Sequence, residues 1–148
     1  MPFTIAHPAL VLPLKRLWPR YFSLSGLMAG AMSPDLLYFL NLTTLNRGLS
    51  HSWIGLALFC VPAAIVFCFA FHRLFKYHFL LNLPSPLDRF FSGLAVSKWG
   101  PVSARDWLIL VGSVLVGALS HFFWDSFTHA SGVLARAIPL LSSTIEIS

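Results

Sequence analysis

The 148 residues of this chain are 57% hydrophobic and only 10% charged, whereas soluble domains carry about 25% charged residues. A surface so poor in charged side chains could not keep 14 Phe and 5 Trp dispersed in water, which excludes a water-soluble globule. The net charge of +5 is spread thinly along the chain, so no basic cluster predicts a nucleic-acid partner. We therefore expect an integral membrane protein that contacts membrane lipids.

The segment from Tyr21 to Leu42 predicts an interrupted membrane span. Ser33-Pro34-Asp35 breaks its apolar pattern, with Ser expected as the N-cap and Pro as the first residue of the next helix. Residues 8–19 before it can form only a short helix, too brief to cross a bilayer alone. Gly26 and Gly30 form a GxxxG pattern, which we expect to let helices of one chain pack closely. An oligomer through the same face is the alternative.

Two further runs without charged residues predict complete spans. They are Ser52–His72 and Trp107–Trp124, and the second can continue as helix to about His129. A spanning helix needs about 20 residues. Ser103 and Asp106 form a capping-box pattern at the start of the second helix.

The distribution of Lys and Arg predicts the orientation of these spans. The stretch before Tyr21 has three and the loop from Arg73 to Asp106 has five, whereas residues 43–51 and the tail after His129 have one each. By the positive-inside rule, the first two segments face the cytoplasm.

The cytoplasmic loop, residues 73–106, contains a second capping-box pattern from Ser85 to Asp88. It predicts a short interfacial helix that carries Phe90, Phe91 and Leu94. Residues 1–148 are thus expected to form a single all-α domain. This membrane-embedded bundle has about three spanning helices, a short amino-terminal helix and the interfacial helix.

Candidate chemistry concentrates on the last span. His121, Asp125 and His129 follow at steps of four, so they share one helix face. An Asp at the centre of a spanning helix costs about 2.5–3.5 kcal/mol on insertion scales, and we expect it to have partners. Imidazole nitrogens and carboxylate oxygens are common ligands of zinc and similar metals.

Three more residues of ligand type are expected at a similar depth. At 1.5 Å per residue, His121 and Asp35 each lie about 21 Å along their helices from the cytoplasmic end. His51 opens the Ser52–His72 span from the outer side, and His7 lies at the outer end of the short helix. The sequence therefore predicts a divalent-metal site near the non-cytoplasmic face.

The order of these motifs resembles a known family. His7, Ser33-Pro34-Asp35, His51 within Arg47–Ser52, and His121 within Gly117–His121 followed by Asp125 resemble the prokaryotic membrane-bound metal-dependent hydrolase family, in its small integral membrane branch. The match covers residues 1 to about 132, and the order is more distantly similar to that of zinc-dependent phospholipase C. The resemblance implies a protein of the prokaryotic cytoplasmic membrane with a divalent metal, zinc or else manganese or iron. The ligands that it implies are His7, Asp35, His51, His121 and Asp125.

One departure from the family pattern concerns the number of metals. Many relatives have PDxDH at the Pro-Asp motif, but Leu37 and Tyr38 occupy the last two positions here. We therefore predict a mononuclear site.

The predicted function is hydrolysis of an ester or phosphoester in an amphiphilic small molecule by a metal-activated water. Asp35 or Asp125 would act as the general base. An ion or proton carrier would also need intramembrane Asp and His residues. A non-catalytic protein that packs against partner helices is the third alternative.

Each candidate residue also has a structural interpretation. An acid near a helix start, such as Asp35, is favoured by the helix dipole alone. His121 and Asp125 could join helices by a mutual hydrogen bond. His51 could be an interfacial residue and His7 a polar residue at a frayed terminus. We expect His129 to be solvated, and His72 and His78 to extend toward water at the inner interface.

Overall fold

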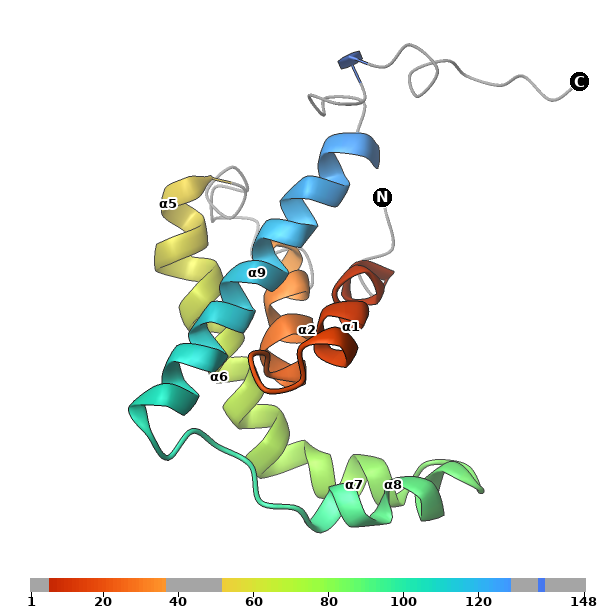
Figure 1. The fold of residues 1–148 in the computed structure, drawn as a ribbon. Coiled ribbons are helices and arrows are strands. Elements are labelled where there is room, and N and C mark those ends of the chain that lie inside the picture. Colours follow the sequence, from red (N-terminus) through yellow and green to blue (C-terminus); the bar gives the residue numbers. More distant parts are fainter. Residues whose placement is uncertain (1–5, 37–51, 129–135, 138–148) are drawn as a thin grey trace, which may run out of the picture.

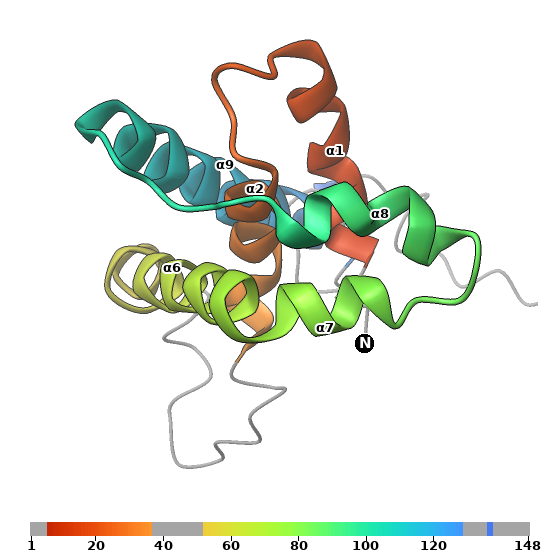
Figure 2. The same ribbon diagram turned by 90° about the horizontal axis from the view of Figure 1, so that it is seen from below.

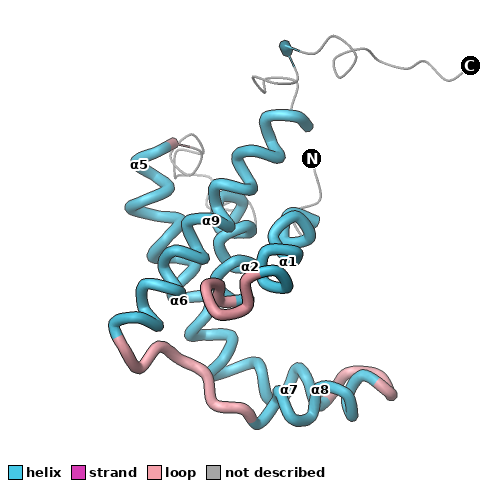
Figure 3. Tube along the Cα trace, in the orientation of Figure 1, coloured by secondary structure: helices cyan, strands magenta, loops and turns pink. Residues whose placement is uncertain are grey.

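The computed structural model describes residues 6–36, 52–128 and 136–137 of the chain. These residues form helices and connecting loops, with no strand among them (Figure 3). The expected all-helical class is confirmed. Two of the described helices are long and apolar enough to cross a membrane, Trp53–Leu81 and Ala104–Thr128.

The first of these long helices is continuous over 29 residues. Its start is as expected, since the Ser52 hydroxyl accepts the Gly55 N–H at 3.0 Å. It ends nine residues later than the expected His72, because no Pro or Gly occurs between His72 and Pro84. Its consecutive segments are α5 (Trp53–Gly55), η3 (Leu56–Cys60), α6 (Val61–Ala70), η4 (Phe71–Phe75) and α7 (Lys76–Leu81).

The second long helix, α9 (Ala104–Thr128), begins at the capping box that the sequence predicts. The Asp106 N–H donates to the Ser103 hydroxyl at 3.2 Å, and the Ser103 N–H donates to the Asp106 carboxylate at 2.9 Å. This helix runs antiparallel to Trp53–Leu81 (Figure 1). Trp53 lies 6.3 Å from Phe122 between ring centroids near one end of the pair.

The predicted interruption at Ser33 takes a different form. Helix α2 (Leu24–Met32) tightens into the 3-10 turn η2 (Ser33–Asp35) instead of ending. Ser33 has helical dihedral angles and donates its hydroxyl back to the Gly30 carbonyl at 2.9 Å, so its predicted N-cap role is wrong. Nine plus three residues span only about 18 Å. The rest of the expected third span, residues 37–42, lies outside the described residues.

Helix α2 packs against α9 in parallel, with the two backbones in close approach. A Cβ on Gly26 would lie 2.9 Å from the Ser113 Cβ, and one on Gly30 would lie 2.2 Å from the Val114 carbonyl oxygen. A Cβ on Gly117 would lie 2.3 Å from the Leu27 carbonyl oxygen. The GxxxG pattern therefore serves packing within one chain, and an oligomer through that face would have to displace α9.

Helix α1 (His7–Leu17) is the expected short amino-terminal helix. It lies beside α2 and α9 (Figures 1 and 2). Val11 packs with Leu27 and Ala31 of α2 in a buried cluster. The Lys15 ammonium closes the turn between α1 and α2 by donating to the carbonyls of Pro19 and Phe22 at 2.7 and 2.8 Å.

The expected interfacial helix is α8 (Leu87–Val96), which packs beside α7. These two helices project sideways from the lower end of the bundle in Figure 1 and lie side by side in Figure 2. The predicted capping box at Ser85 does not form, because Pro86 occupies the N-cap position and no side chain caps the helix.

A polar cluster at the same end of the bundle corrects the expectation for His72. Its Nε2 lies 2.7 Å from the Ser25 hydroxyl of α2, and its ring stacks on Trp99 with centroids 4.0 Å apart. The nearby Lys76 is buried and donates to the carbonyl and hydroxyl of Ser97. His72 therefore packs between elements instead of extending toward water.

We expect Gly117→Ala to destabilise the bundle by about 1–3 kcal/mol, because the new methyl group would meet backbone atoms of α2 that cannot move independently. Gly112→Ala is a matched control on the same helix, since a Cβ there meets nothing within 4 Å. It should leave stability unchanged or raise it by up to about 1 kcal/mol. Thermal unfolding in detergent followed by circular dichroism measures both. Equal stability of the two variants would contradict the close approach of α2 and α9.

Candidate metal centre

The structure brings four of the predicted ligands together at one end of the bundle. His7 begins α1, Asp35 ends η2, and both His121 and Asp125 lie on α9. His7, His121 and Asp125 each offer a ligand atom within 4.8 Å of the others. His51 and His129 lie outside the described residues.

His121 is held in one orientation by the backbone of α2. Its Nδ1 lies 2.8 Å from the Ala31 carbonyl oxygen. Because a carbonyl can only accept, Nδ1 carries the proton, and Nε2 is the basic nitrogen of the neutral ring. That nitrogen faces two carboxylates, Asp125 Oδ2 at 3.2 Å and Asp35 Oδ1 at 3.5 Å. A backbone carbonyl that fixes the tautomer in this way is a common support of metal-bound histidines.

Asp125 bridges the Nε2 atoms of the two imidazoles. Its Oδ1 is 3.3 Å from His7 Nε2, while its Oδ2 faces His121. The two rings stack with centroids 4.0 Å apart and an angle of 18° between their planes. Both imidazoles therefore present Nε2 to the same carboxylate, and a positive charge on both rings at once would be opposed by their close stacking.

Burial differs sharply between the bases and the acids of this cluster. The side chains of His7 and His121 are 1% and 0% exposed, whereas those of Asp35 and Asp125 are 13% and 15% exposed. Among the residues that the structure describes, the cluster is therefore open to its surroundings on the carboxylate side. His7 Nδ1 is buried as well and has no hydrogen-bond partner in the part of the chain that the structure describes.

Local sequence explains why these side chains converge. Pro8 follows His7 and suits the first turn of α1, where its missing N–H is not needed. On α9, the steps of four align Gly117, His121 and Asp125 on one face. Since Gly117 lets α2 approach closely, the carbonyl of Ala31 comes within reach of His121.

The donor set fits a divalent metal ion. In a tetrahedral site with metal–ligand bonds of about 2.0–2.2 Å, the ligand atoms are about 3.4 Å apart. Three nitrogen–oxygen separations in the cluster, 3.2, 3.3 and 3.5 Å, are close to that edge length and are also within the range of ion pairs. One ligand atom from each of His7, His121 and Asp125 lies within 4.8 Å of the others, so these residues could hold an ion. Two largely buried carboxylates also need compensating positive charge, which one divalent ion would provide.

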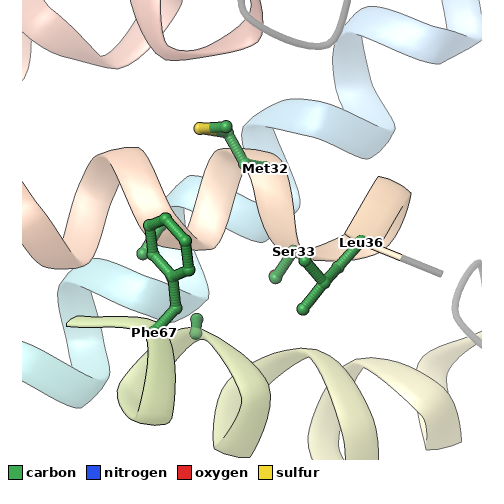
Figure 4. A pocket seen from close by; sticks show the side chains of 6 residues that line it. Met32, Ser33, Leu36 and Phe67 are labelled. Carbon is green, nitrogen blue, oxygen red and sulfur yellow. The ribbon is translucent and has the colours of Figure 1, made fainter. Parts of the chain in front are cut away.

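A small apolar cavity of about 30 Å³ lies between α2, η2 and α6 (Figure 4). It is lined by Ala29, Met32, Ser33, Leu36, Ala64 and Phe67, and none of the four cluster residues takes part in the lining. Ligand pockets usually have volumes of about 300–1,000 Å³, so this cavity cannot hold a substrate.

A comparison with protein-family models finds one match that covers the whole chain. The family is described as "Domain of unknown function (DUF4184)", and the match spans residues 1–148. The chain belongs to this family. No curated protein matches the chain, and no solved structure does. The family assignment leaves the function to be argued from the geometry of the cluster.

Some features of the cluster have no signal in the sequence. The carbonyl of Ala31 is a backbone group that any residue could supply, and the stacking of His7 on His121 joins residues that are 114 positions apart. The residue types and their order in the sequence did indicate which four side chains form the cluster, namely His7, Asp35, His121 and Asp125. The roles predicted for Asp35 and Asp125 as general bases remain predictions, and Asp125 contacts both imidazoles.

We expect Nδ1 of His121 to be protonated at neutral pH, whatever the state of Nε2, because the Ala31 carbonyl requires a donor. Long-range ¹H–¹⁵N correlation spectra of histidine-labelled protein would show this. The histidine signal that is missing from the spectrum of the His121→Gln variant is the signal of His121. An His121 ring that carries its only proton on Nε2 would contradict the geometry.

Proposed function

We propose that this chain is an integral membrane protein that binds one divalent metal ion through His7, His121 and Asp125 and acts as a hydrolase on amphiphilic esters or phosphoesters. The Asp35 carboxylate lies beside these ligands, 3.5 Å from His121 Nε2. The observation that carries the proposal is the arrangement of two Nε2 atoms and two carboxylates at ligand–ligand distances, with the His121 tautomer fixed by a carbonyl. The resemblance of the motif order to membrane-bound metal-dependent hydrolases supports the same conclusion.

Membrane insertion is supported by the surface of the two long helices. Leu58 and Val66 on the first helix are 75% and 67% exposed, and Leu108 on α9 is 75% exposed. Side chains of this kind along a helix of spanning length favour contact with lipid over contact with water. The proposed cytoplasmic side is the end that carries Lys15, Arg16 and Arg20 and the Lys and Arg residues of the 73–106 loop.

The surface around the cluster supports an amphiphilic substrate. Trp124, next to Asp125 on α9, is 41% exposed, and Leu10 on α1 is 39% exposed. An apolar tail could contact these side chains from the bilayer while its polar head meets the carboxylate side. A divalent ion held here would supply a Lewis acid for the ester or phosphoester group. Asp35 is the proposed general base, since Asp125 contacts both rings and is the proposed ligand, whereas the Asp35 carboxylate lies beside them at 3.5 Å from His121 Nε2.

The same cluster supports one rival function. Its four groups lie within 3.2–3.5 Å of a neighbour and could share protons instead of a metal, as in an ion or proton carrier. Release of product from a panel of lipids by the metal-loaded protein would favour the hydrolase. Proton or ion flux into proteoliposomes without product release would favour the carrier.

We expect protein purified in detergent to contain about one zinc, manganese or iron ion per chain. His121→Ala and Asp125→Asn should lose that ion, because each removes a ligand atom. His78→Ala is the control, since His78 is an exposed histidine outside the cluster. Elemental analysis by mass spectrometry measures all four proteins. Equal, trace metal in every sample would sink the metal proposal.

We expect Lys98→Cys and Arg136→Cys to react from opposite sides of the membrane, because the basic end of the bundle is proposed to face the cytoplasm. Each is placed in a Cys60→Ala/Cys68→Ala background. Labelling of intact and opened spheroplasts with an impermeant maleimide measures the accessible side. Reaction of both cysteines from one side would contradict the proposed topology.

A further inference from the structure

The first long helix is longer than a bilayer core. Its 29 residues extend about 44 Å, whereas the hydrocarbon core is about 30 Å thick. Helix α7, the last six residues of the helix, accounts for about 9 Å of the excess. If the helix spans the membrane, α7 and the adjoining α8 lie at the level of the lipid headgroups.

Helix α8 carries an apolar stripe that the bundle does not cover. Leu87, Phe90 and Leu94 follow the helical repeat and are 46%, 79% and 51% exposed. The residues buried where α7 and α8 pack include Leu80 and Ala95. The stripe therefore does not hold the two helices together.

This part of the chain is also positively charged. Residues 73–106 contain five Lys or Arg and two Asp. Arg73, Arg89, Lys98 and Arg105 are exposed. Of the acids, Asp106 accepts hydrogen bonds from Val102 and Ser103 at the start of α9. An apolar stripe on a helix within a basic segment is the pattern of helices that lie in the surface of an anionic membrane.

We infer that the hairpin formed by α7 and α8, residues 76–96, lies in the cytoplasmic headgroup region of the same bilayer and binds anionic lipid. Lipid is the proposed partner of the apolar stripe, because the hairpin is continuous with a helix that is proposed to enter the bilayer. The buried Lys76, which donates to Ser97, ties the end of α8 back to α7 at this level. The inference rests on the proposed membrane insertion and is independent of the metal.

The test places a bimane label at Phe90→Cys or at Ser92→Cys in the Cys60→Ala/Cys68→Ala background. Ser92 is a matched control, because it is exposed on the same helix but lies about 200° around the axis from Phe90. Full-length protein is reconstituted in phosphatidylcholine vesicles with or without phosphatidylglycerol. Quenching by lipid-borne nitroxides at two depths and by aqueous iodide locates each label.

The Phe90→Cys label should lie about 5–10 Å inside the headgroup boundary and resist iodide, while the Ser92→Cys label should be quenched by iodide. Phosphatidylglycerol should move the Phe90→Cys label deeper, and Arg89→Gln/Lys98→Gln should abolish that shift. The inference would be overturned if iodide quenched both labels alike, or if the depth of the Phe90→Cys label were the same with and without phosphatidylglycerol.

A label at Val66→Cys separates this inference from the proposed membrane insertion. If iodide also quenches the Val66→Cys label, membrane insertion itself is wrong. Loss of iodide access only on addition of a second protein, or of more copies of the chain, would assign the stripe to that partner and overturn the inference as well.

Discussion

The close approach of α2 and α9 is the constraint on which the rest of the structure depends. Glycines at positions 26, 30 and 117 remove the side chains that would hold the two backbones apart. The gain is twofold, because dispersion contacts increase and backbone groups of one helix come within reach of side chains on the other. The hydrogen bond from His121 to the Ala31 carbonyl depends on this proximity.

The acid and imidazole cluster also couples elements that are distant in sequence. On α9, Asp125 contacts His7 of α1, and His121 contacts Asp35 of η2. An ion at their centre would join the three elements directly. The stability of the bundle and the proposed reaction would then depend on the same side chains. Loss of one ligand would therefore weaken the packing of α1 as well as the reaction.

The sequence predicted the helical class, the starts of both long helices and the four clustered side chains, because these follow from local patterns. Ser52 and Ser103 cap helices whichever elements surround them. Ser33 was misjudged, since its hydroxyl can cap a new helix or bond back to the preceding turn, and only the packing of α2 decides. The position of His72 likewise depends on Trp99, which reaches it from a distant loop.

The stacked imidazoles tie the start of the first helix to the last one. His7 begins α1, and its ring packs on the fully enclosed ring of His121. Movement of α1 away from the bundle would therefore expose the His121 ring to solvent. The reactivity of that ring toward a histidine-modifying reagent would thus report how firmly the first helix is docked.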